Sequence, residues 1–375
     1  TAVGNSTTAD MDFGGAIYKF DGATTFTAVS TGTMDMAAAV AFTTAADNIE
    51  FATAGIALAD GANLNIDTAS GAGNITVGGA ITGVSVETVT IDAGTGTTSV
   101  AAIGSSTQIG ALSIGSTHNG GITLNGAIVT DGAVTIDGPV TLATGAVSVT
   151  TANDAITFNH SIDGGQALTL VAGTAATAIQ GEIGGSTAIS SLTITNGTAN
   201  GTIEITNIGG VTGATAIGNT NTGTITLDGT AYTTTGTQTY TAATGQNIDI
   251  TGVATFTTTN SNIGFATAGV DFANDGTTTI NTGTGAGDVT FGGAIETDGA
   301  DDDLLVVTSG TGDVTFTGAI GATNELGGLS VNASSGAGNI TFTSTIGDAD
   351  NAGVIGTTAV GNSTTADMDF GGAIY

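Results

Sequence analysis

The sequence predicts an all-β fold, a right-handed parallel β-helix (β-solenoid) of about 14 coils per 357-residue repeat. Three observations predict it. Apolar residues alternate with Thr in short segments, Gly-rich pieces separate these segments, and similar segments recur at intervals of 25 to 28 residues. Helix signals are nearly absent, because no sustained 3.6-residue periodicity runs through the chain.

The alternating segments are typical of half-buried β-strands. An apolar, Thr, apolar pattern has a period of two, which places the apolar side chains on one face and the β-branched Thr on the other. The Gly-rich pieces between the segments favour corners, because Gly reaches positive φ without a steric penalty. Examples of the segments are Ile122-Thr123-Leu124, Val134-Thr135-Ile136, Ile156-Thr157-Phe158 and Ile225-Thr226-Leu227.

A short motif sets the length of one coil. The pattern x-[Ile/Val/Met]-[Thr/Asp]-Phe begins at Asp288, Asp313, Asn339 and Asp367, which gives steps of 25, 26 and 28 residues. Periods in the twenties with short β segments indicate a solenoid, in which each coil stacks on an equivalent neighbour. An antiparallel sandwich is the competing fold, but the periods are too short for a sandwich module and no linker interrupts the chain.

Two longer repeats organise the chain. The eighteen residues Thr1–Tyr18 recur without a difference as Thr358–Tyr375, an offset of 357. We therefore expect residues 1–357 to be one full repeat unit of a tandem array, and residues 358–375 to be the start of the next. Inside the unit, residues 1–130 and 215–347 are homologous, with 18 identities in the 34 positions from Asn48 to Ile81. The sequence thus predicts an internal piece of a larger polypeptide.

The charge balance limits the partners of the chain. It contains 32 Asp and Glu residues against a single base, Lys19, so its formal net charge is −31. Nucleic acid and anionic membrane surfaces attract proteins through clustered Lys and Arg, so we expect no nucleic-acid partner and no membrane insertion. Because Cys is absent, disulfide scaffolds, thiol enzymes and Cys-ligated zinc sites are excluded.

Two stretches resemble a known class of proteins. The segments Gly310–Gly347 and Tyr232–Gly252 resemble the β-strand repeats of giant bacterial surface proteins, the filamentous-haemagglutinin-like and autotransporter-type adhesins. The resemblance implies an extracellular right-handed β-helix used as a fibre, stalk or adhesin body, and it carries over no catalytic residue. The composition is also similar to that of surface-layer proteins with calcium-binding repeats. However, Asp288 directly follows Gly287, which departs from their GGxGxDxxx nonapeptide and argues against a calcium roll.

Two acidic turns are candidate calcium sites. Ca²⁺ takes six to eight oxygen ligands, and closely spaced carboxylates beside glycines supply ligands of this type. The alternative is a solvated acidic loop that aids solubility. The candidate ligands are Glu296, Asp298, Asp301, Asp302 and Asp303 in the first turn, and Asp348, Asp350 and Asn351 in the second.

Catalytic interpretations have little support in the residues. Asp154, His160 and Ser161 would suit a nucleophilic trio, but nothing in the sequence fixes their geometry. His118, the other His, lies in a Gly-rich turn. A lyase acting on acidic sugars would need Arg or Lys, whereas a paired-carboxylate hydrolase stays open in principle. We expect no enzyme activity.

Thr-x-Thr pairs leave one further alternative. Thr315 with Thr317, and Thr341 with Thr343, would build a flat Thr ladder of the ice-binding type, although Thr is also simply a good β-sheet residue.

The function that the sequence predicts is structural. We expect a repeat unit of an extracellular fibre, sheath or adhesin stalk, located outside or on the surface of a bacterial cell. Its main partner would be further copies of itself, end to end or side by side, with calcium as the one candidate cofactor. The alternatives are an adhesin body that binds a glycan or surface ligand, and a surface-layer protein.

Overall fold

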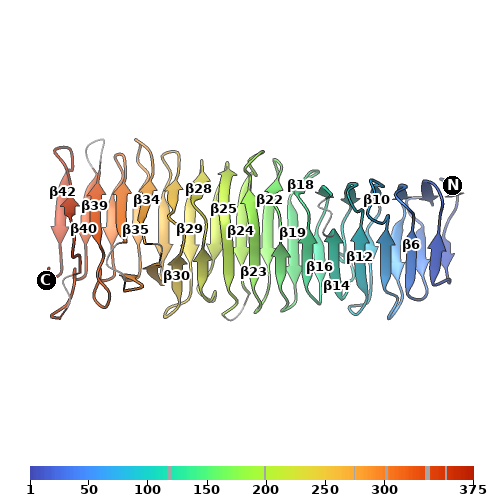
Figure 1. The fold of residues 1–375 in the computed structure, drawn as a ribbon, viewed down its shortest axis with the longest axis horizontal. Helices are drawn as coiled ribbons and strands as arrows, with labels where there is room; N and C mark the ends of the chain where they lie inside the picture. Colours follow the sequence, from blue (N-terminus) through green and yellow to red (C-terminus); the bar gives the residue numbers. More distant parts are fainter. Residues whose placement is uncertain (116–119, 198–199, 274, 300–302, 334–337, 351–352) are drawn as a thin grey trace. The chain divides into compact units, whose positions relative to one another are not determined.

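The structure is a computed structural model that describes residues 1–115, 120–197, 200–273, 275–299, 303–333, 338–350 and 353–375. These residues contain β-strands and no helix, and the strands pair in parallel. The chain divides into two compact units, Thr1–Gly181 and Glu182–Tyr375. Within each unit, successive coils lie side by side (Figure 1). The predicted right-handed parallel β-helix is thus confirmed, with about 15 turns.

In the first unit, the coils contribute strands, and at one position a single bridging residue, to three columns. The first column contains β1 (Ala2–Gly4), β4 (Thr24–Thr27), β7 (Ile49–Phe51), β10 (Ile75–Val77), β13 (Thr98–Val100), β15 (Ile122–Leu124), β18 (Val140–Leu142) and β21 (Ile162–Asp163). The second contains β2 (Met11–Phe13), β5 (Thr33–Met36), β8 (Gly55–Leu58), β11 (Ile81–Thr82), the bridging residue Ile103, β16 (Ile128–Thr130), β19 (Val147–Thr151) and β22 (Ala167–Val171). The third contains β3 (Ile17–Lys19), β6 (Val40–Thr43), β9 (Leu64–Asp67), β12 (Thr88–Asp92), β14 (Ala111–Gly115), β17 (Val134–Asp137), β20 (Ile156–Phe158) and β23 (Thr177–Ile183).

The second unit has the same three-column plan. The long strand β25 (Ile203–Val211) begins two of its columns. One continues through β28 (Ala231–Thr234), β31 (Thr255–Thr257), β34 (Thr277–Asn281), β37 (Leu304–Thr308), β39 (Gly328–Asn332) and β41 (Thr358–Val360). The other continues through β27 (Ile225–Leu227), β30 (Asn247–Ile250), β33 (Gly269–Phe272), β36 (Ile295–Thr297) and the bridging residues Ile320, Ile346 and Ile374. The third column contains β24 (Ser191–Thr195), β26 (Thr215–Gly218), β29 (Gln238–Thr241), β32 (Ile263–Ala266), β35 (Val289–Phe291), β38 (Val314–Phe316), β40 (Asn339–Phe342) and β42 (Asp367–Phe370).

The core of each unit lies inside the coils. Ile122 and Leu124 are buried, whereas Thr123 between them faces outward, as the period-two pattern predicts. Parallel pairing in register places each inward residue on a similar residue of the next coil, as Ile122 lies on Val140. Burial of this apolar surface, at about 25 cal/mol per Å², is the main source of stability.

The four Phe-containing motifs form one aromatic column. Phe291, Phe316, Phe342 and Phe370 stack face to face, with centroid distances of 5.1, 4.8 and 5.0 Å between successive rings. The steps of 25, 26 and 28 residues that predicted one coil therefore correspond to successive strands of a single column.

Buried hydroxyl groups close many of the corners. A Thr or Ser at the end of a strand donates its hydroxyl hydrogen to a backbone carbonyl two to five residues further along its own turn. Each bond satisfies a buried polar atom, which is worth about 1 kcal/mol. Such residues are Thr44, Thr68, Thr130, Thr151, Thr234, Thr258, Thr282 and Ser309.

A ladder of Asn and Asp side chains fixes the register of the coils in the second unit. Asn262 Oδ1 accepts a hydrogen bond from the backbone nitrogen of Asp288 at 2.9 Å. Asp288 Oδ1 accepts one from Asp313 N at 2.9 Å, and Asp313 Oδ1 accepts one from Asn339 N at 2.8 Å. Because each bond joins one coil to the next, a slip of one residue would break the whole series.

Candidate functional site

Glu296, the first predicted calcium ligand, forms hydrogen bonds to the backbone of the next coil. It lies in β36, and its Oε2 accepts hydrogen bonds from the backbone nitrogens of Thr323 at 3.0 Å and Asn324 at 2.9 Å. The carboxylate therefore holds a turn of the following coil, where it satisfies two backbone donors. One of its oxygens is already engaged by protein.

Glu296 also ends a short ladder of acidic side chains. Asp249 pairs in register with Asp271, and Asp271 pairs with Glu296, so three carboxylates occupy equivalent positions on β30, β33 and β36. Oδ1 of Asp249 and Oδ1 of Asp271 are shielded from solvent, and no described residue donates a hydrogen bond to either.

The surroundings of the two Asp residues of this ladder disfavour their charged forms. Burial raises the pKa of Asp249. Burial also raises the pKa of Asp271, and the negative charges of Asp249, Asp298 and Glu296 raise it further. The closeness of its acidic neighbours therefore adds to burial as a cause of the raised pKa of Asp271.

The other predicted calcium ligands are dispersed. Asp298 is exposed just after β36, whereas Asp303 is buried, with 1% of its surface exposed. Asp348 Oδ1 accepts a hydrogen bond from the backbone nitrogen of Asp350 at 2.7 Å, which makes a local turn. Asp301, Asp302 and Asn351 lie outside the described residues.

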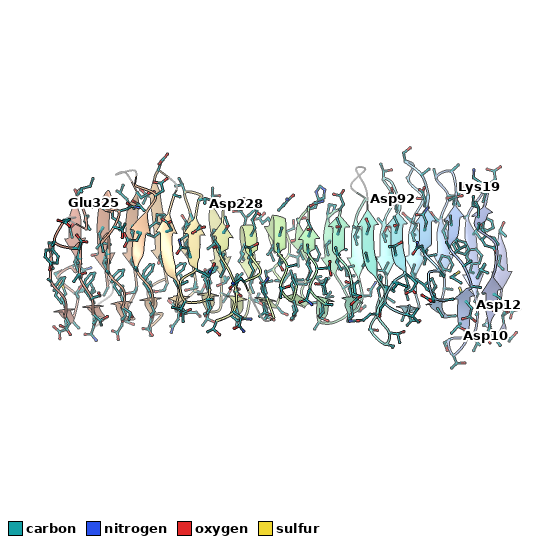
Figure 2. The ribbon with its side chains drawn as sticks, turned by 90° about the horizontal axis from the view of Figure 1, so that it is seen from below. Asp10, Asp12, Lys19, Asp92, Asp228 and Glu325 are labelled. Carbon is teal, nitrogen blue, oxygen red and sulfur yellow. The ribbon has the colours of Figure 1, made fainter. Side chains whose placement is uncertain are left out.

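In the described part of the chain, no three His, Cys, Asp or Glu side chains are grouped closely enough to hold a metal ion. Charged side chains instead lie along the edges of the coils: Figure 2 shows Lys19 and Asp92 along one edge of the first unit, and Asp10 and Asp12 along the opposite edge. Calcium binding stays a prediction, and additional oxygen ligands would have to complete any such site.

His160 has a partner outside the trio that was considered for catalysis. Its Nε2 lies 3.3 Å from Oδ1 of Asp137, which belongs to the preceding coil, and both side chains are about 30% exposed. Asp154 is exposed, and its backbone carbonyl accepts a hydrogen bond from Thr151. The contact to Asp137 fits an ion pair between coils when His160 is protonated. His118 lies outside the described residues.

Not all hydroxyl groups of the predicted Thr ladder are free to face solvent. Thr315 and Thr341 pair in register on β38 and β40. However, the hydroxyl of Thr343 donates to the backbone carbonyls of Phe316 at 3.1 Å and Thr317 at 3.0 Å. This hydroxyl therefore ties two coils together.

Sequence reasoning missed a buried carboxylate in the first unit. Glu87 is fully buried, and its Oε2 and Oε1 accept hydrogen bonds from the backbone nitrogens of Val84 at 2.7 Å and Gly61 at 3.3 Å. Burial by itself raises the pKa of Glu87, but the backbone donors outweigh it, so the pKa lies below its usual value. The side chain joins the loops of two neighbouring coils.

A second missed feature is a polar network inside the second unit. Gln238 is fully buried, and its Nε2 donates to the backbone carbonyls of Tyr232 at 2.8 Å and Thr257 at 2.9 Å. Tyr240 donates its hydroxyl hydrogen to Gln238 Oε1 at 3.0 Å, and burial raises the pKa of Tyr240. The network is internally satisfied, so it fixes the packing of the core.

Comparison with family models, curated proteins and solved structures finds no match to this chain. Among the described residues, no helix is long and apolar enough to cross a membrane.

Proposed function

We propose that this chain is a structural repeat unit of an extracellular fibre, sheath or adhesin stalk built from tandem β-solenoid repeats. The observation that carries the proposal concerns the two identical segments, which we call the N-terminal copy (Thr1–Tyr18) and the C-terminal copy (Thr358–Tyr375). Both are built into coils, and both fold in the same way. A period of 357 residues is thus compatible with the geometry of the solenoid.

The turn that follows the first strand is nearly the same in both copies. Asn5 Oδ1 accepts hydrogen bonds from the backbone nitrogen and hydroxyl of Thr7 at 2.9 and 2.6 Å. Asn362 Oδ1 accepts the same two bonds from Thr364 at 2.8 and 2.6 Å. The glycine before each Asn has a φ of 73° in one copy and 75° in the other, a region that favours Gly.

The bonding pattern suits a mechanical role. In the second unit, backbone hydrogen bonds, the stacked aromatic rings and the Asn and Asp ladder all join one coil to the next. A load along the stack is therefore shared by three columns of strands. Repeat proteins of this kind gain stability mainly from contacts between neighbouring repeats.

The net charge limits how separate copies can pack side by side. A net charge of −31 keeps separate copies apart at low salt, so lateral packing would require counterions. The resemblance to bacterial adhesin repeats supports the proposed location, on or outside a bacterial cell.

The test is to measure the intact mass of the native polypeptide and to image the isolated material. We expect a mass of several repeat units and long filaments or stalks. A native mass near 35.7 kDa would contradict the tandem array. A two-dimensional lattice would favour the surface-layer alternative. Isolated chains that bind a glycan would favour the ligand-binding adhesin body.

A further inference from the structure

We infer that the last coil of one copy of this chain is the docking site for the first eighteen residues of another copy, in one defined register. The inference deepens the proposed function, because it names the partner surface by which tandem or separate copies would join. Its basis is that the C-terminal copy is chemically identical to the N-terminal copy. The structure therefore already contains those eighteen residues packed on the final coil.

The C-terminal copy is held at all three columns. Its first strand pairs Thr358 to Val360 with Leu329 to Val331 of β39, and its second pairs Asp367 to Phe370 with β40. In the remaining column, Ile374 bridges to Ile346. We call this surface of β39, β40 and Ile346 the docking edge.

Backbone hydrogen bonds set the register on the docking edge. The backbone nitrogen of Gly361 donates to the carbonyl of Val331 at 2.8 Å, and that of Gly371 donates to Phe342 at 2.7 Å. The backbone nitrogen of Tyr375 donates to the carbonyl of Ile346 at 3.0 Å. Phe370 stacks on Phe342 with an interplanar angle of 4°.

The N-terminal copy uses the opposite edge of the same eighteen residues. Its strands β1, β2 and β3 pair with β4, β5 and β6 of the following coil. The two sets of pairings do not compete, because one lies on the side of the preceding coil and the other on the side of the following coil. One segment can therefore have both neighbours at once.

Burial of equivalent residues agrees with this division. Phe13 is 6% exposed because Phe26 and Phe42 of the following coil pack against its ring, with centroid distances of 5.5 and 5.2 Å. The equivalent residue Phe370 has the preceding coil as its neighbour and is 41% exposed. Ile17 is 66% exposed, and its equivalent Ile374, which forms a bridge to the preceding coil, is 61% exposed. Docking would cover the apolar surface that each copy leaves open.

The last residue of the Asn and Asp ladder also pairs with an acidic residue at the junction. Asn339, its last member in the second unit, pairs in register with Asp367. The residue equivalent to Asp367 is Asp10, and its Oδ1 accepts a hydrogen bond from the backbone nitrogen of Thr33 at 2.9 Å. The ladder and the strand pairings thus point to the same register.

In the 375-residue chain, the C-terminal copy fills the docking edge, so this chain should not join end to end. The test therefore frees the edge in the full-length protein with the double substitution Phe370→Asp and Ile374→Asp. The N-terminal copy is unchanged, so it can dock on the freed edge of another molecule. Such a head-to-tail contact does not close, so it produces a series of linear multimers.

We expect sedimentation velocity to show one species for the wild-type chain and a concentration-dependent series of multiples for the double variant. The matched control adds Ile17→Asp to the double variant. Ile17 is largely exposed, so its replacement should leave the first coil of its own chain folded. The same replacement should abolish the multimers, because it alters the docking segment. Multimers that persist in the triple variant, or a folded double variant that stays monomeric, would overturn the inference.

A peptide probe identifies the occupant directly. A fluorescein-labelled peptide with the sequence of Thr1–Tyr18 should bind the double variant saturably and should not bind the wild-type chain, whose edge is filled. A peptide with Phe13→Asp should lose this binding. Equal binding of both peptides would contradict the register proposed here.

A second measurement serves if the double variant does not fold. A second copy of residues 19–375 is fused directly after Tyr375, so that residues 358–375 end the first copy and begin the second. Hydrogen exchange is then measured at this shared segment. We expect exchange of its strand amides to slow by about tenfold or more relative to the 375-residue chain, because the segment gains its second neighbour. Unchanged exchange would refute the docking. A native polypeptide with a single copy would instead contradict the proposed function and leave these results untouched.

Discussion

Replacing Phe316 with Ala tests whether the aromatic column stabilises the stacking of the coils. Phe316 is 1% exposed and lies between Phe291 and Phe342, with centroid distances of 5.1 and 4.8 Å and nearly parallel rings. Removing a fully buried Phe side chain leaves a cavity and costs about 3–5 kcal/mol. Of this, each lost aromatic pair contributes about 0.5–1.5 kcal/mol.

Phe370 provides the matched comparison. It belongs to the same column, but it stacks on Phe342 alone and is 41% exposed. Part of its surface is already in water and it has one aromatic neighbour, so Phe370→Ala should cost roughly half as much. Phe316→Leu, which keeps most of the buried volume, should cost about 1 kcal/mol.

The assay must resolve individual coils, because a stack of repeats does not unfold in a single two-state step. Native-state hydrogen exchange gives an opening free energy for each strand. We expect Phe316→Ala to lower this free energy by about 3–5 kcal/mol at β35, β38 and β40 and to leave β20 in the first unit unchanged. A loss below about 1 kcal/mol, or an equal loss from Phe370→Ala, would refute the reasoning.

Three further predictions concern the acidic residues. Glu87→Gln should destabilise the first unit by about 1–2 kcal/mol at pH 7, measured by denaturant unfolding, because it weakens two buried charge-assisted hydrogen bonds. The pKa of Glu87 is lowered, so its contribution to the free energy of unfolding is present above the usual pKa of 4.5 and is lost as the pH falls through the folded-state pKa. If the free energy of unfolding of the variant fell equally steeply in acid, this prediction would be contradicted. Asp271→Asn should raise the melting temperature at pH 7 and have little effect at pH 3. The pKa of Asp271 is raised, so its protonated form is tolerated in acid, and its ionisation lowers the stability of the fold as the pH rises. Asp350→Asn, at an exposed position, is the control. Restoring Ca²⁺ after EGTA treatment should raise the melting temperature, because binding at a hundredfold excess over Kd adds about 2.7 kcal/mol to the free energy of unfolding. Equal recovery in NaCl of matched ionic strength would exclude a specific calcium site.

The fold could be predicted from sequence because its rule is local and repeated. Alternation of apolar residues and Thr places side chains inside or outside each coil, and the recurrence of one motif gives the length of the coil. The motifs at Asp288, Asp313, Asn339 and Asp367 therefore predicted a real column of the structure. The three-column plan was not predicted, because the corner positions depend on which turns the glycines adopt.

The buried polar groups were beyond the reach of the same reasoning. Gln238 and Glu87 look like ordinary surface residues, because polar residues occur throughout the outward positions of this sequence. Their burial depends on the partners supplied by the adjacent coil, such as the carbonyl of Thr257 for Gln238 and the nitrogen of Gly61 for Glu87. A pattern within one strand contains no information on these partners.

The acidic turns show why closeness in sequence is a poor guide to a site in this fold. Residues that are close along a turn can differ in environment, as the exposed Asp298 and the buried Asp303 do. Residues one coil apart are the true neighbours: Glu296 binds the backbone of Thr323, 27 residues further on. The ladder of Asp249, Asp271 and Glu296 has this spacing, so a search for acidic residues separated by one coil would have found it. In a solenoid, charges and ligands therefore have to be compared along the columns, because the columns set which side chains share an environment.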